Sequence, residues 1–145
     1  MLAIVADDQP IIRQALAMAL RDLAGFDQII EVESGPAALA VATLSIPFGF
    51  GTVLPIDLVV MDRNMPLGNG IEALRSMRNV GLETPVIVAT GDNSEEARRE
   101  AFDAGANGYL CKPFAGEALA AEVARVLARK GARGGGDGHP DDTGA

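Results

Sequence analysis

The sequence predicts a protein of the α/β class, with a parallel β-sheet covered by helices on both faces. Three observations lead to this prediction. Short apolar runs alternate five times with longer segments of helical periodicity, and consecutive parallel strands need such a helical crossover between them. The chain has 145 residues, which is the size of one domain with a single sizeable core. Its residues are 48% hydrophobic and 22% charged, as in ordinary globular proteins.

Each predicted strand is a short, mainly apolar run, as expected where both faces of a sheet are buried. The third run begins at Ile56, is nearly all apolar and ends directly before an acid. The predicted strands cover residues 2–6, 27–33, 56–61, 85–89 and 108–111. With a helix after each strand, the chain order is (βα)5.

The predicted helices begin and end at residues that suit those positions. Pro10 is tolerated in a first helical turn, and Gly25 ends the first helix. Ser94 can cap the fourth helix, where Glu95 and Glu96 interact favourably with the helix dipole. The predicted helices run from Pro10 to Gly25, from Ser34 to about Leu44, over 70–79, from Ser94 to near Gly105, and over 115–130.

Charge and composition exclude several classes of function. The chain has 12 Lys and Arg against 20 Asp and Glu, a net charge of −8. This balance argues against direct binding to nucleic acid or to an anionic membrane, because both need a basic surface. The single cysteine, Cys111, excludes an internal disulfide and suits a reducing, cytoplasmic location. One cysteine and one histidine, His139, cannot form a zinc site.

We expect one domain over residues 1–130 and a disordered tail over residues 131–145. The tail, GARGGGDGHPDDTGA, is rich in glycine and cannot contribute to a packed core. Residues 34–56 carry no charge and are numerous enough to resemble a membrane span. The prolines and glycines among them divide this stretch into helix, loop and strand instead. The first residues are not a signal peptide, because two acids follow a short apolar run.

Three acids follow two of the predicted strands at the points where those strands end. Asp7 and Asp8 come after the first strand, and Asp62 comes after the third. The carboxyl ends of parallel strands share one edge of a sheet. In the flavodoxin-like, doubly wound order 2-1-3-4-5, the first and third strands are neighbours and ligands bind in the crevice between them. Three converging carboxylates are costly without a cation, and an open site of oxygen ligands suits Mg²⁺.

Two further polar groups end strands at the same edge. Thr90 ends the fourth strand and offers a hydroxyl, and Lys112 ends the fifth and offers an ammonium group. Carboxylates, a hard cation, a hydroxyl and an ammonium group around one crevice are typical of phosphoryl transfer. In such a site an acid acts as the nucleophile, while the metal and the lysine hold the phosphoryl oxygens.

These residues, in this order, resemble the receiver domains of two-component response regulators, and the chain is similar to single-domain chemotaxis regulators. The resemblance covers roughly residues 1–130. Each motif alone is weak, but together they are specific. The matching pieces are Asp7-Asp8, Asp62-Arg63-Asn64-Met65-Pro66 with Gly70 beyond, Thr90, and Tyr109 with Lys112-Pro113.

The resemblance implies a role for each residue around the acids. Asp62 is the expected phosphoacceptor. Asp8 and Asp62 bind Mg²⁺ through their side chains, Asn64 binds it through its main-chain carbonyl, and Asp7 acts mostly through a metal-bound water. Lys112 pairs first with the acceptor carboxylate and then with the phosphoryl group.

The resemblance also implies a conformational switch. Thr90 is expected to move to the phosphoryl oxygen, and Tyr109 to turn inward behind it. The bond between Lys112 and Pro113 is expected to be cis, which X-Pro bonds allow at modest cost. Asn64 and Asp92 occupy positions that tune the lifetime of the phosphoaspartate.

The implied partners are proteins. A histidine kinase or a histidine phosphotransfer protein donates the phosphoryl group, a downstream protein target receives the signal, and neither nucleic acid nor membrane is bound directly. The resemblance implies that the protein is a regulator rather than an enzyme. Ile12 is either a contact for the donor or a core residue, and the stretch SEEARREAFD is either a solvated helix face or part of the output surface.

One loop departs from the family pattern. Residues 45–55, SIPFGFGTVLP, are longer and more apolar than this connection requires. Either Phe48 and Phe50 pack back onto the domain, or the loop contacts a partner or a second copy in a dimer.

Three alternative functions stay open at this stage. The chain could be the receiver domain of a longer regulator with a DNA-binding output domain. A phosphatase of the haloacid dehalogenase type needs a second acid two residues after its nucleophile, where this chain has Asn64. A flavodoxin needs a phosphate loop rich in Ser and Thr after its first strand, where this chain has acids.

Overall fold

A computed structural model describes residues 1–46 and 53–133 of the chain. Its centre is one sheet of five parallel strands in the order β2-β1-β3-β4-β5. The strands are β1 (Leu2–Ala6), β2 (Gln28–Val32), β3 (Leu58–Asp62), β4 (Val86–Thr90) and β5 (Gly108–Cys111). The predicted α/β class, the flavodoxin-like fold and the strand order are confirmed.

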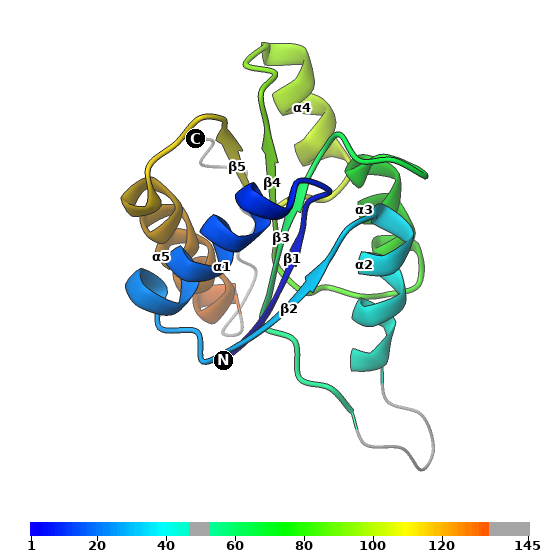
Figure 1. Cartoon of the computed structure of the whole chain (residues 1–145). Coiled ribbons are helices and arrows are strands. Elements are labelled where there is room, and N and C mark those ends of the chain that lie inside the picture. The colour runs from blue at the N-terminus through cyan, green and yellow to red at the C-terminus, as the bar shows by residue number, and fades with distance from the viewer. Residues whose placement is uncertain (47–52, 134–145) are drawn as a thin grey trace.

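Helices cover both faces of this sheet (Figure 1). Helices α1 and α5 lie against one face, and α2, α3 and α4 lie on the other. The helices are α1 (Pro10–Ala24), α2 (Gly35–Ala42), α3 (Gly70–Asn79), α4 (Glu95–Asp103) and α5 (Gly116–Arg133), and a 3-10 turn, η1 (Thr43–Ser45), follows α2. None of the helices in the described ranges is both long and apolar enough to cross a membrane.

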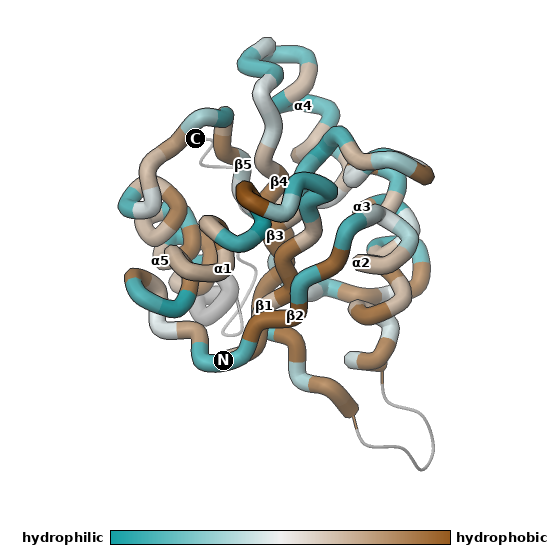
Figure 2. The backbone as a smooth tube through the Cα atoms, viewed as in Figure 1, coloured by the Kyte–Doolittle hydropathy of each residue, from teal (hydrophilic) through white to brown (hydrophobic). Residues whose placement is uncertain are grey.

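The alternation of side chains along each strand divides the core into two layers. Ile4 of β1 and Met61 of β3 face α2 and α3, whereas Val5 and Val60 face α1 and α5. Strands β1, β3 and β4 are buried along their full length, and Figure 2 shows them as largely hydrophobic. The interior strands therefore give the polar residues at their carboxyl ends a rigid support.

Three helices begin at a side-chain cap, and these caps fix where the chain leaves each loop. Ser34, Asn69 and Ser94 each accept a hydrogen bond from the backbone N–H three residues ahead. Helix α1 has no side-chain cap at its start. It ends at Gly25, whose φ of 79° lies in the left-handed region. Because Asn69 and Ser94 precede α3 and α4, they set how both helices approach the edge of the sheet that carries Asp62 and Thr90.

Several elements differ from their predicted bounds. Strand β3 begins at Leu58 rather than Ile56 and includes Asp62. Helix α2 ends at Ala42 because the hydroxyls of Thr43 and Ser45 donate to carbonyls of its last turn. Helix α5 continues to Arg133. The predicted tail begins at residue 131, but residues 131–133 belong to α5. Phe48, Phe50 and the part of the tail from residue 134 onward lie outside the described residues.

Candidate functional site

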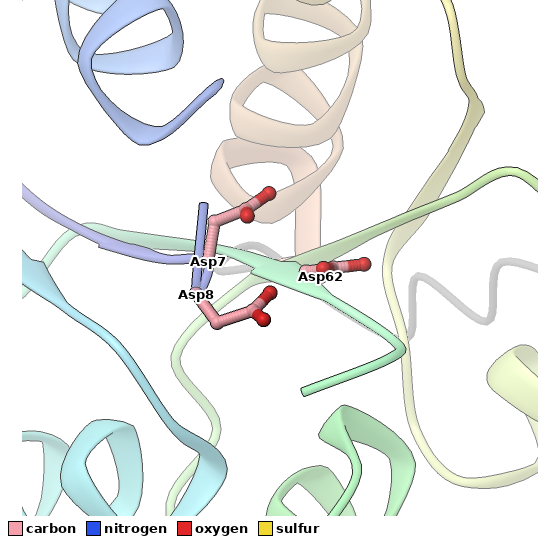
Figure 3. A group of neighbouring side chains, drawn as sticks. All are labelled: Asp7, Asp8 and Asp62. Atoms are coloured by element: carbon pink, nitrogen blue, oxygen red, sulfur yellow. The ribbon is translucent and has the colours of Figure 1, made fainter. Parts of the chain in front are cut away.

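Three carboxylates from two adjacent strands lie together at the carboxyl edge of the sheet. Strands β1 and β3 pair in parallel with Ala6 opposite Met61, so Asp7 and Asp8 follow β1 beside Asp62 at the end of β3. One oxygen from each carboxylate lies within 4.8 Å of the others. Figure 3 shows the three side chains projecting toward the same side of this edge. The sequence-predicted acids are therefore close enough to share one cation.

The three acids differ in burial and in how firmly they are held. Asp7 is fully buried, Asp62 is 6% exposed, and Asp8 is exposed to solvent. The backbone N–H of Gln9 donates to Asp7 Oδ1 over 2.9 Å, and that of Asn64 donates to Asp62 Oδ1 over 3.2 Å. Two carboxylates are thus fixed by the backbone of their own loops, whereas Asp8 faces solvent.

Lys112 forms ion pairs with two of the three carboxylates, those of Asp7 and Asp62. Its Nζ lies 3.0 Å from Asp7 Oδ2 and 3.4 Å from Asp62 Oδ1. Three carboxylates and one ammonium group leave two formal negative charges at the site. This donor set of oxygens, open to solvent on the side of Asp8, fits Mg²⁺, which keeps several of its waters when protein carboxylates bind it.

The environment of Asp62 opposes its charge. Burial raises the pKa of the Asp62 carboxyl above its ordinary value, and the neighbouring Asp7 adds to this rise. The Asn64 N–H and the Lys112 ammonium group favour the charged form, but they do not offset burial. A cation or an electrophile that approaches Asp62 therefore meets a carboxylate whose charge is only partly compensated.

The two predicted switch residues, Thr90 and Tyr109, both bond to Asp92. Thr90 is fully buried at the end of β4, and its Oγ1 accepts a hydrogen bond from the Asp92 N–H over 3.1 Å. The Tyr109 hydroxyl donates to the Asp92 carbonyl over 2.6 Å. Burial, followed by the charge of Asp92, raises the pKa of the Tyr109 hydroxyl. One loop thus connects both side chains.

Strand β5 and the loop after it bring in the remaining predicted residues. The backbone N–H of Lys112 donates to the Thr90 carbonyl over 2.7 Å, which continues the pairing of β5 with β4 past Cys111. The peptide bond between Lys112 and Pro113 is cis. Lys112 therefore reaches the acids from the strand next to the one that carries Thr90.

Sequence reasoning assigned no role to two arginines at this site. Arg13 of α1 donates from Nη1 to the Asp7 carbonyl over 2.8 Å and from Nε to Glu31 over 3.1 Å. Arg63, directly after Asp62, pairs with Glu100 of α4. No local pattern indicates which acids they reach, because Glu31 and Glu100 lie far away in the sequence.

The structure also resolves which isoleucine of the first helical turn is exposed. Ile12 is half-buried and packs against the core on the α1 side of the sheet. Ile11 is the exposed residue, at 78%. Ile12 therefore serves at least in part as the core residue that one interpretation predicted.

Comparison with known proteins gives the family. Residues 3–124 match the family described as the response regulator receiver domain. The chain belongs to this family. The receiver domain is 34% identical over 128 residues to the transcriptional regulatory protein PrrA of Mycobacterium tuberculosis, an alignment that covers 88% of this chain and 50% of that protein. It is 30% identical to the two-component response regulator ORR41 of Oryza sativa, over 84% of this chain and 91% of that protein.

Solved structures agree with this family. The chemotaxis response regulator CheY4 of Vibrio cholerae superposes with a TM-score of 0.74 at 31% identity, covering 87% of this chain and 98% of that one. The receiver domain spans about half the length of the first transcriptional regulators that it matches. Family membership supports the interpretation as a two-component receiver domain over the phosphatase and flavodoxin alternatives.

Proposed function

We propose that this receiver domain accepts a phosphoryl group on Asp62 from a phosphohistidine of a histidine kinase or a histidine phosphotransfer protein. An Asp62 carboxylate oxygen attacks phosphorus, the bond between phosphorus and the imidazole nitrogen breaks, and the donor leaves as histidine. The observation that carries the proposal is the convergence of Asp7, Asp8 and Lys112 on Asp62. Burial raises the pKa of Asp62. Perturbed pKa values are typical of functional groups, so this shift supports Asp62 as the acceptor.

We propose that the same acids hold Mg²⁺. The side chains of Asp8 and Asp62 and the main-chain carbonyl of Asn64 are the ligands, and Asp7 acts through a bound water. When bound, the cation neutralises charge on the phosphoryl oxygens. The exposure of Asp8 and the 4.8 Å limit between the carboxylate oxygens support this assignment.

Three residues on β4 and β5 or directly after them respond to the phosphoryl group: Lys112, Thr90 and Tyr109. Lys112 already bridges Asp7 and Asp62 and is positioned to hold a phosphoryl oxygen. The Thr90 hydroxyl leaves the Asp92 N–H to donate to another phosphoryl oxygen. The Tyr109 ring is already buried, with its hydroxyl on the Asp92 carbonyl, and the phosphoryl group favours this inward arrangement. This shift in population changes the surface formed by α4, β5 and α5.

The output of the switch is a protein contact. In one form of this proposal the chain acts alone, either on a downstream protein or as a step in a phosphorelay. In the other it is the receiver domain of a longer regulator with a DNA-binding output domain, which the half-length match to transcriptional regulators favours. In both forms the domain is a cytoplasmic regulator rather than an enzyme, and dimerisation is one way to transmit its signal.

Intact-protein mass after incubation with acetyl phosphate tests the reaction. We expect a single phosphoryl adduct in the presence of Mg²⁺, and little in EDTA. Asp62→Asn should abolish the adduct. Asp57→Asn is the matched control, because Asp57 lies near the opposite end of β3 and accepts from the Leu2 N–H. An adduct on Asp62→Asn, or none on wild type with either acetyl phosphate or a phosphohistidine donor, would refute the proposal.

A further inference from the structure

Helix α4 is weakly anchored by apolar packing. Its only buried residues among those described are Ala97 and Ala101, and the largest apolar side chain on the helix, Phe102, is 37% exposed. Small side chains bury little area, so the hydrophobic contribution to holding the helix is small. Figure 1 shows α4 projecting beyond the other helices at one end of the molecule. Polar contacts therefore have a large share in fixing its position.

One of these contacts comes from the residue next to the phosphoacceptor. The Arg63 guanidinium forms an ion pair with Glu100 Oε1, and Arg75 of α3 lies 3.8 Å from the other oxygen of Glu100. The Arg63 side chain is 23% exposed. Its Nε is buried and has no hydrogen-bond partner among the residues that the structure describes. The position of this guanidinium therefore depends strongly on Glu100.

The backbone of Arg63 is fixed at the site. Its N–H donates to the Ala89 carbonyl of β4 over 2.9 Å, and its carbonyl accepts from the Gly70 N–H over 2.8 Å. The charge of Arg63 also reaches the switch loop. Hydrogen bonds from Ser94 hold the pKa of Asp92 below its ordinary value, and Arg63 adds to this effect. Arg63 thus adjoins Asp62, the Asp92 loop and α4 at once.

We propose that Arg63 is a positioning residue that couples the Asp62 loop to α4 through its ion pair with Glu100. This inference rests on the proposed function. A phosphoryl group on Asp62 adds negative charge one residue away and competes with Glu100 for the guanidinium. The ion pair then weakens, and α4 is released from the loop.

Hydrogen exchange of the α4 amides in the full chain tests the coupling, first without phosphorylation. Arg63→Gln and Glu100→Gln should each speed exchange over residues 95–103 by about twofold to fivefold, as expected for a partly exposed ion pair. The double variant should be no faster than either single one. Arg99→Gln, an exposed charge in the middle of the same helix, is the matched control and should leave exchange nearly unchanged. Unchanged exchange in both single variants, or additive effects in the double variant, would overturn the proposal.

The second measurement adds acetyl phosphate and Mg²⁺, and reads the phosphorylated fraction by mass in the same samples. Phosphorylation should speed α4 exchange in wild type and in Arg99→Gln, but should change it much less in Glu100→Gln. A merely structural ion pair would leave the effect of phosphorylation intact. Equal effects in all variants would overturn the coupling. No adduct in wild type with acetyl phosphate or with a phosphohistidine donor would refute the proposed function, whereas the first measurement still decides whether Arg63 tethers α4.

Discussion

Replacing the proposed phosphoacceptor by its neutral amide should stabilise the fold. In Asp62→Asn the side chain keeps its shape and its oxygen can still accept from the Asn64 N–H, but it loses its charge. That charge is buried, at 6% exposure, and burial raises the pKa of Asp62 above its ordinary value. A carboxyl whose pKa is raised by folding destabilises the folded state once the pH is high enough to ionise it.

The distances at the site give the size of this effect. At an effective dielectric constant of about 20, the 3.4 Å pair of Asp62 with Lys112 is worth about 5 kcal/mol. Repulsion from Asp7, at most 4.8 Å away, is at least about 3.5 kcal/mol on the same scale. Asp8 adds a smaller, solvent-screened repulsion. The charge interactions nearly cancel, so the desolvation of Asp62 remains, and Asp62→Asn should gain about 1 to 2 kcal/mol.

Urea unfolding in EDTA measures this gain, and its pH dependence checks the cause. Below the ordinary Asp value of 3.8, Asp62 is protonated in both folded and unfolded chains, so its charge has no effect. The gain should therefore be small at the ordinary value of 3.8 and grow as the pH rises through the raised pKa of Asp62 in the folded state. Asp22→Asn, an exposed acid on α1, should change stability by less than about 0.5 kcal/mol. A less stable Asp62→Asn, or a gain independent of pH, would refute the reasoning.

Three further predictions concern single groups. In thermal unfolding, Mg²⁺ at about a hundred times its Kd should stabilise wild type by about 2.7 kcal/mol. The same Mg²⁺ concentration should stabilise Asp8→Asn by clearly less. Equal stabilisation of both would contradict Asp8 as a metal ligand. Arg78→Ala should destabilise the fold by about 2 to 4 kcal/mol in urea, because Arg78 donates to the Gly105, Leu82 and Thr84 carbonyls; a loss no larger than that of Arg21→Ala would argue against this role. The only tyrosine, Tyr109, should ionise in an ultraviolet titration above its ordinary value of 10.0 because of burial.

The fold and the acid cluster could be predicted because they depend on short patterns. A buried parallel strand is an apolar run, and the acid that ends it is adjacent in sequence. Once the order of the strands is inferred, the edge shared by Asp7, Asp8 and Asp62 follows from the direction of parallel strands. The start of β3 was less certain, because the backbone N–H of Asp57 already bonds to the Leu2 carbonyl before the strand begins.

The side-chain links between elements could not be predicted in this way. Arg63 meets Glu100 across 37 residues, and Arg78 meets Gly105 across 27. Charged residues on helices are common, and nothing in their spacing says which of several acids a given arginine will reach. Whether Ile12 packs in the core or contacts the donor likewise depended on the rotation of α1 against the sheet, which apolar residues at the start of a helix do not determine.

Gly70 shows how a sequence motif follows from the geometry of the site. A Cβ atom on this residue would overlap the Asp62 carbonyl oxygen and lie 3.1 Å from the Met61 side chain. The first turn of α3 therefore packs directly against the end of β3. The Gly70 N–H closes the loop by donating to the Arg63 carbonyl. This close approach lets the loop from Asp62 to Gly70 stay short. Any larger residue at position 70 would move the loop, and with it the acid, the predicted metal-binding carbonyl of Asn64 and the arginine that reaches α4.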